Sequence, residues 1–77
     1  MNIKRRKALE ALAEKIAELE SDLQQLLDEE QEYFDNMPES IQYSSKGEAA
    51  QSAIDSMESA VNYLQDAAEL AREATGE

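Results

Sequence analysis

Apolar residues in the first half of the chain recur at alternating steps of three and four residues. The series is Leu9, Leu12, Ile16, Leu19, Leu23, Leu26, Tyr33 and Met37, and Glu30 occupies the one skipped position. A period of about 3.5 residues, kept over about four heptads, is typical of the partner-facing side of a coiled-coil helix. Because no glycine or proline interrupts residues 3–36, the pattern predicts one helix over that range.

The second half of the chain carries the same spacing in a series of smaller side chains. Its members are Ala50, Ile54, Met57, Val61, Leu64, Ala68 and Ala71, and they predict a second helix over residues 46–74. A further heptad position is alanine throughout, at Ala53, Ala60, Ala67 and Ala74. This row favours either the close approach of a partner helix or simply a high helix propensity.

Residues 37–45 form a hinge between the two helices. Pro38 disfavours the helical conformation at Met37, so the first helix should end there. Ser45 and Glu48 have the spacing of a capping box, which would start the second helix. The sequence therefore predicts an all-α fold with a single domain, residues 1–77, built as an antiparallel two-helix coiled-coil hairpin.

A single hairpin of this kind does not bury every apolar residue. With Leu9 as heptad position a, Leu27 and Phe34 fall at position e, beside the expected helix contact. With Ile54 as position a, two apolar residues of the second helix lie at the outer position c. Exposed apolar rows usually mark interfaces. We therefore expect a homodimer that forms a four-helix bundle, with an interface of Leu27, Phe34, Tyr63 and Leu70.

The charge of the chain is strongly acidic and unevenly distributed. The 77 residues contain 7 basic and 18 acidic side chains, a formal net charge of −11. Four basic residues form the arm Lys4-Arg5-Arg6-Lys7, so residues 8–77 hold three basic against 18 acidic residues, a net charge of −15. Such a body repels nucleic acids and anionic membranes and attracts basic surfaces. We expect a protein partner with a basic surface and no direct nucleic-acid binding, although the arm leaves that possibility open.

The composition also argues against catalysis. The chain has no histidine and no cysteine, which removes the commonest general base, thiol chemistry and zinc clusters. No di-iron Glu-x-x-His motif or calcium-loop pattern is present. We therefore expect neither an enzyme nor a cofactor or metal site. No signal peptide or membrane span is expected either, and a cytoplasmic location follows.

Two groups of residues are candidates for binding a partner. The acidic stripe Glu10, Glu14, Glu18 and Asp22 repeats at four-residue steps, a spacing at which like charges repel. It is either a solvated face, a protein-docking surface or a mimic of a nucleic-acid backbone. The hinge aromatics either plug the hinge or, with acidic neighbours, form a recognition tip. The candidate tip residues are Glu29, Glu30, Glu32, Tyr33, Phe34, Asp35 and Tyr43.

The hinge also carries a family resemblance. The segment Glu32-Tyr33-Phe34-Asp35-Asn36-Met37-Pro38-Glu39-Ser40-Ile41-Gln42, followed by Ser45-Lys46-Gly47-Glu48, resembles a widespread set of small acidic helical-hairpin proteins, mostly uncharacterised, of phages, prophages and bacterial mobile elements. The resemblance covers about residues 25–70. It implies an inhibitor that binds and blocks a host defence or nucleic-acid-handling protein. The alternative is a homo-oligomeric scaffolding bundle without a host target.

Overall fold

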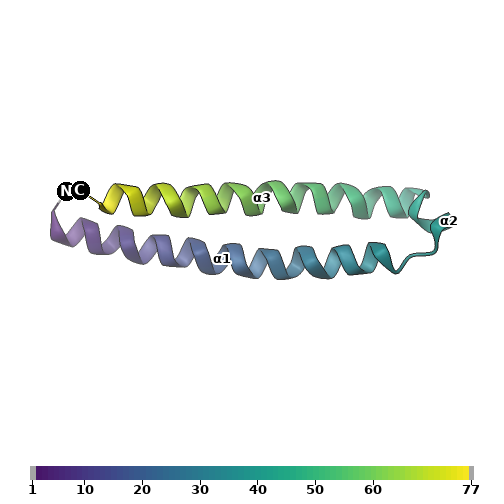
Figure 1. Cartoon of the computed structure of the whole chain (residues 1–77), viewed down its shortest axis with the longest axis horizontal. Helices are drawn as coiled ribbons and strands as arrows, with labels where there is room; N and C mark the ends of the chain where they lie inside the picture. Colours follow the sequence, from purple (N-terminus) through teal and green to yellow (C-terminus); the bar gives the residue numbers. More distant parts are fainter. Residues whose placement is uncertain (1, 77) are drawn as a thin grey trace.

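The computed structural model describes residues 2–76 and is helical throughout this range apart from the short connections. Its elements are α1 (Ile3–Asp35), α2 (Glu39–Gln42) and α3 (Ser45–Thr75). The two long helices lie side by side and run in opposite directions, and the single turn of α2 joins them at one end (Figure 1). The result is a rod with extents of 58 × 14 × 12 Å.

Local capping interactions explain where the long helices begin and end. The Asn2 side chain accepts a hydrogen bond of 2.8 Å from the backbone N–H of Arg5, which satisfies one free donor at the start of α1. At the other end of α1, the Asn36 N–H donates to the Glu32 carbonyl, and Pro38 follows two residues later. The helix therefore ends at Asp35, because a proline disfavours the helical conformation of the residue that precedes it.

The start of α3 differs from the predicted capping box. Ser44, not Ser45, is the N-cap residue, and its side chain makes no capping bond to α3. Its hydroxyl instead donates to the carbonyl of Ile41 in the preceding turn. The capping-box prediction is wrong because Ser45 is already the first residue of α3, and the hydroxyl of the N-cap residue Ser44 bonds back to α2 rather than forward to α3.

The core of the helix pair uses two adjacent rows of side chains from each long helix. Its centre is a cluster of Leu27, Ile54 and Val61, against which Leu23, Phe34 and Met57 pack. In heptad terms, α3 contributes its a and d positions, as the sequence predicts. In contrast, α1 contributes positions a and e: Ala13 and Leu27 at e are buried, and Phe34 at e is half-buried.

The predicted helix contact of α1 is therefore wrong in one of its two rows. The four residues at position d, which we call the leucine row, are 47–56% exposed: Leu12, Leu19, Leu26 and Tyr33. The reason is geometric, because the apolar surface of α1 is three rows wide (a, d and e) whereas one partner helix covers about two. The row that stays outside is the one that the sequence had placed inside.

The same geometry bears on two residues predicted for the dimer interface, Leu27 and Phe34. Leu27 is only 7% exposed and belongs to the core cluster, while Phe34 is half-buried against it. Leu27 cannot pack against a second copy without opening the helix pair, whereas part of the Phe34 surface stays exposed. The other two predicted interface residues do lie at the surface, with Tyr63 74% and Leu70 63% exposed.

Candidate protein-binding surface

The acidic stripe is carried by the outer surface of α1. All four of its members, Glu10, Glu14, Glu18 and Asp22, are exposed. Each step of four residues turns the side chain by about 40° because an α-helix advances 100° per residue. The stripe therefore winds across the outer surface by roughly 120° instead of following one line. A flat partner surface would contact part of it, whereas a concave surface would contact all of it.

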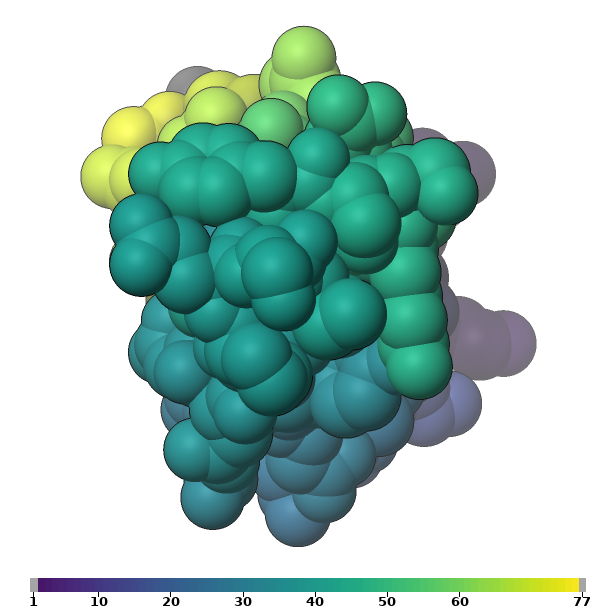
Figure 2. Space-filling model, turned by 90° about the vertical axis from the view of Figure 1, so that its right-hand side faces the viewer, coloured from purple at the N-terminus to yellow at the C-terminus, as the bar shows by residue number. Residues whose placement is uncertain are grey.

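The hinge end presents aromatic and acidic side chains together. Tyr43 is 79% and Tyr33 47% exposed, and the nearby Phe34 is only half-buried. Among the predicted tip carboxylates, Glu29, Glu32 and Asp35 are exposed, whereas Glu30 is half-buried at the position that interrupts the apolar series. The turn and the start of α3 form the end surface seen in Figure 2. The two predicted roles are thus divided: the tyrosines are available to a partner, and Phe34 faces the core.

A cation contributes to this end of the rod as well. The Nζ of Lys46 lies 5.8 Å from the centre of the Tyr33 ring, within the range of a cation–π contact. The same two residues border a small hollow together with Met37, Pro38 and Ile41. Met37 is buried, so it closes the floor between the helix ends.

The turn itself is held by a set of short-range contacts centred on Gln42. Its side-chain Nε2 donates a hydrogen bond of 3.1 Å to the carbonyl of Phe34, near the end of α1. Its backbone lies against Gly47 in the first turn of α3, at a place where a β-carbon on Gly47 would meet the Gln42 Cα at 2.6 Å. One residue of α2 therefore contacts both long helices and sets the direction of the turn.

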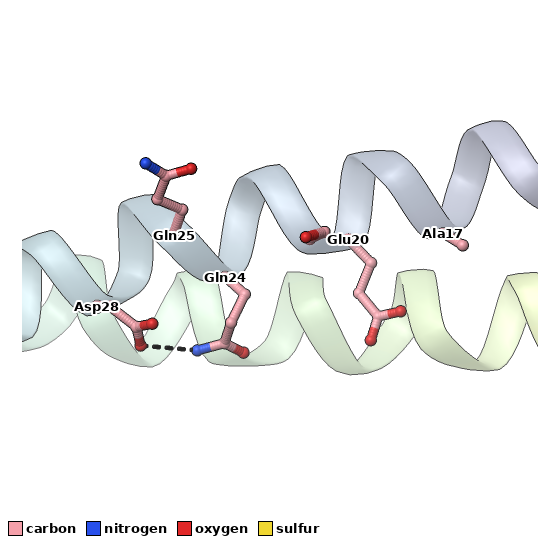
Figure 3. A pocket seen from close by; sticks show the side chains of 6 residues that line it. Ala17, Glu20, Gln24, Gln25 and Asp28 are labelled. Carbon is pink, nitrogen blue, oxygen red and sulfur yellow. Dashed lines mark hydrogen bonds between the residues drawn. The ribbon is translucent and has the colours of Figure 1, made fainter.

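A second shallow hollow lies along α1, and its lining is polar (Figure 3). Gln24 donates a hydrogen bond of 2.9 Å to Asp28 there, and Glu20 lies one turn away. The same amide-to-carboxylate pairing at a spacing of four residues recurs at Gln31–Asp35 and Gln51–Asp55, both at 3.0 Å. These bonds stabilise the helix surface by a few tenths of a kcal/mol each, about 0.2–0.5 kcal/mol in isolated helices.

Within residues 2–76, no three metal-ligating side chains lie close enough together to hold an ion. None of the described helices combines the length and the apolar character that a membrane crossing requires. Comparison of the chain with protein-family models, curated proteins and solved structures finds no match.

The sequence identified the acidic stripe and left open whether the hinge tyrosines are exposed, and it did not predict the exposed leucine row. Heptad spacing predicts the leucine row for the helix contact, but the spacing shows only that these residues share one face of the helix and not that this face is buried. A signal was present, since Leu27 and Phe34 mark position e as a third apolar row beside a and d. Three such rows on one helix indicate more than one neighbour.

Proposed function

We propose that this chain is a non-enzymatic, acidic protein-interaction module that binds a basic surface of a partner protein. The main support for this proposal is that Glu10, Glu14, Glu18 and Asp22 repel one another along α1 and are all exposed. A stripe of this kind costs helix stability, and a basic partner would offset the cost. The tyrosines at the hinge end supply aromatic anchor contacts.

The resemblance of the hinge to small phage and mobile-element proteins extends this proposal to an inhibitor of a host defence or nucleic-acid-handling protein. Charge density supports nucleic-acid mimicry as the mode of binding. The net charge of −15 on residues 8–77, spread over at most 58 Å, gives one charge per about 3.9 Å. The spacing along one DNA strand is about 3.4 Å per charge. A channel that accepts a single strand would meet a similar line of charge.

The test uses a neutralised variant that keeps the shape of each side chain: Glu10→Gln, Glu14→Gln, Glu18→Gln and Asp22→Asn together. A matched control neutralises four exposed acids of α3, namely Glu48, Asp55, Glu58 and Glu69. Affinity capture from a bacterial lysate, eluted in rising salt, should yield a stoichiometric basic partner with the wild type and the control. Capture that is undiminished by the stripe variant would refute docking through the stripe.

Mimicry makes a separate prediction about competition. Single-stranded DNA should displace the captured partner, because both ligands would occupy one channel. Simultaneous binding of DNA and this chain to the partner would contradict mimicry and leave ordinary protein docking.

We propose that α1 and α3 form a coiled-coil hairpin that pairs with a second copy in a four-helix bundle. The exposed leucine row also favours the second candidate function, a homo-oligomeric scaffolding bundle without a host target. That candidate predicts recovery of the chain's own copies alone in the capture experiment.

A further inference from the structure

The leucine row is the more apolar of the two rows that compete for the core of the helix pair. The row at position e, which packs toward α3, includes Arg6 and Glu20 among its members. The row left outside follows Arg5 and has leucine at three consecutive heptad positions and then tyrosine, with no charged residue among these four. A helix that needed to satisfy only α3 would bury the uninterrupted row. Its exposure therefore indicates a second neighbour for α1.

The alanine row of α3, defined as Ala53, Ala60, Ala67 and Ala74, lies on the same side of the rod. The cation–π contact establishes this, because Lys46 stands one heptad before Ala53 and reaches the Tyr33 ring of the leucine row. Three of the four alanines are exposed. Tyr63 and Leu70 lie next to the alanine row, at the outer position c. Together these residues form one surface, the leucine–alanine face.

This face is nearly free of the acidic charge that covers the rest of the molecule. The helix α1 carries ten acidic residues and α3 carries six. On this side lie heptad positions d and g of α1 and positions c and g of α3, and only Asp22 and Glu29, both at g of α1, are acidic there. Lys15 and Lys46 lie on the same side, and Arg5 lies one heptad before the leucine row. A face that is apolar and weakly basic can approach another copy of itself, whereas the acidic faces of two copies repel.

The size of the face fits a stable protein–protein contact. The whole rod measures 58 Å by 14 Å along its two longer axes, a projected area of roughly 800 Å², which is similar to the area that each partner contributes to an interface of standard size.

We propose that the leucine–alanine face binds a second copy of this chain, with a two-fold axis passing beside Leu19 and the two α1 helices antiparallel. This inference rests on the dimer in the proposed function and specifies its surface. The axis places Leu12 against Leu26 of the second copy, because their positions are equidistant from Leu19. It also places Lys15 near Asp22 of the second copy, and Arg5 near its Tyr33. An isologous interface requires such self-complementary pairs, each formed twice.

Sedimentation equilibrium of the full chain at micromolar concentration tests the surface. The wild type should sediment as a dimer, at twice the 8.6 kDa of one chain. Leu19→Lys should sediment as a monomer and retain its helical circular dichroism. Since this substitution lowers the net negative charge of each chain, increased overall repulsion between two acidic chains cannot account for dissociation. Gln25→Lys, which makes a similar charge change at another exposed site of α1, should remain dimeric. A monomeric wild type, or a dimer that survives Leu19→Lys, would overturn the proposal.

A charge swap tests the antiparallel register. Lys15→Asp should weaken the dimer roughly tenfold, since it opposes two carboxylates across the interface at two symmetric places. Adding Asp22→Lys should restore the wild-type affinity. A double variant as weak as the single variant would refute this register.

Salt separates the dimer from binding to a host protein. Higher salt should strengthen the dimer by screening the repulsion between two acidic chains, and it should weaken binding to a basic partner. A chain that dimerises but captures no partner would refute only the host-target proposal. A monomeric chain that captures a partner would refute only the dimer.

Discussion

Replacement of Gly47 by alanine changes the free energy of unfolding through two effects of opposite sign, and the structure indicates which one is larger. Gly47 lies inside the first turn of α3, where alanine would ordinarily stabilise the helix by about 1 kcal/mol. However, a β-carbon here would lie 2.5 Å from the Gln42 carbonyl carbon and 2.6 Å from its Cα, with the carbonyl oxygen closer still. All three atoms belong to the backbone, so no side-chain rotation relieves the overlap.

The magnitude follows from the movement that the overlap requires. Ordinary carbon–carbon contacts lie at about 3.5–4.0 Å, so α2 and α3 must separate by roughly 1 Å. Overpacking of this kind costs about 1–3 kcal/mol, and the separation also strains the contacts that Gln42 makes with the end of α1. We expect Gly47→Ala to lower the free energy of unfolding by about 2 kcal/mol net. In a domain of this size, that corresponds to a fall in Tm of about 8–16 °C.

The assay is thermal unfolding followed by circular dichroism, at one protein concentration because a dimer makes Tm concentration-dependent. Gly76→Ala is the matched control: its β-carbon would lie 3.3 Å from the Glu73 carbonyl oxygen, and its backbone is already helical. The control should change stability by less than about 0.5 kcal/mol. An unchanged or raised Tm for Gly47→Ala would show that helix propensity outweighs the contact and refute the reasoning.

Three further predictions concern the core, the turn and the charge. Ile54 is 1% exposed, so Ile54→Val should cost about 0.5–1.5 kcal/mol and Ile54→Ala about 2–5 kcal/mol; chemical denaturation checks both, and equal costs would contradict the packing. Gln42→Ala removes the bond to the Phe34 carbonyl and should cost about 0.5–1.5 kcal/mol, whereas Gln25→Ala at an exposed site should be neutral; a neutral Gln42→Ala would show that the turn does not depend on this bond. Raising salt from about 0.01 M to 1 M shortens the screening length from about 30 Å to 3 Å, so Tm should rise for a chain of net charge −11; a fall would indicate net attractive surface electrostatics.

The positions of the helices and the turn could be predicted from the sequence because each depends on local features. The uninterrupted heptad pattern predicts long helices, and the backbone restriction before Pro38 predicts where the first one ends. The choice of core rows could not be predicted in the same way. Leu26 and Leu27 are neighbours in the sequence, yet one is 56% and the other 7% exposed. Which of them faces α3 depends on the rotation of the whole helix about its axis, and no local sequence pattern determines that rotation.

The candidate site shows the same division. Exposure of the acidic stripe follows from charge, since carboxylates are rarely buried without partners. The different fates of Tyr33 and Phe34 do not follow from residue type, because both are aromatic and adjacent. Similarly, the capping box failed because Ser44 and Ser45 offer the same chemistry one residue apart, and only the bond to Ile41 distinguishes them.

Because α1 and α3 are antiparallel, the sequence separation between contacting residues increases steadily from the turn to the open end. At the turn, contacts join residues close in sequence, such as Gln42 with Phe34, eight residues apart. At the open end, Ile3 and Thr75 are separated by 72 residues (75 − 3). Closing a short loop costs less entropy than closing a long one, so pairing that starts at the turn and proceeds outward adds each contact at little further cost. Folding should therefore begin at Gln42 and Gly47, and amide hydrogens should exchange fastest near the open end.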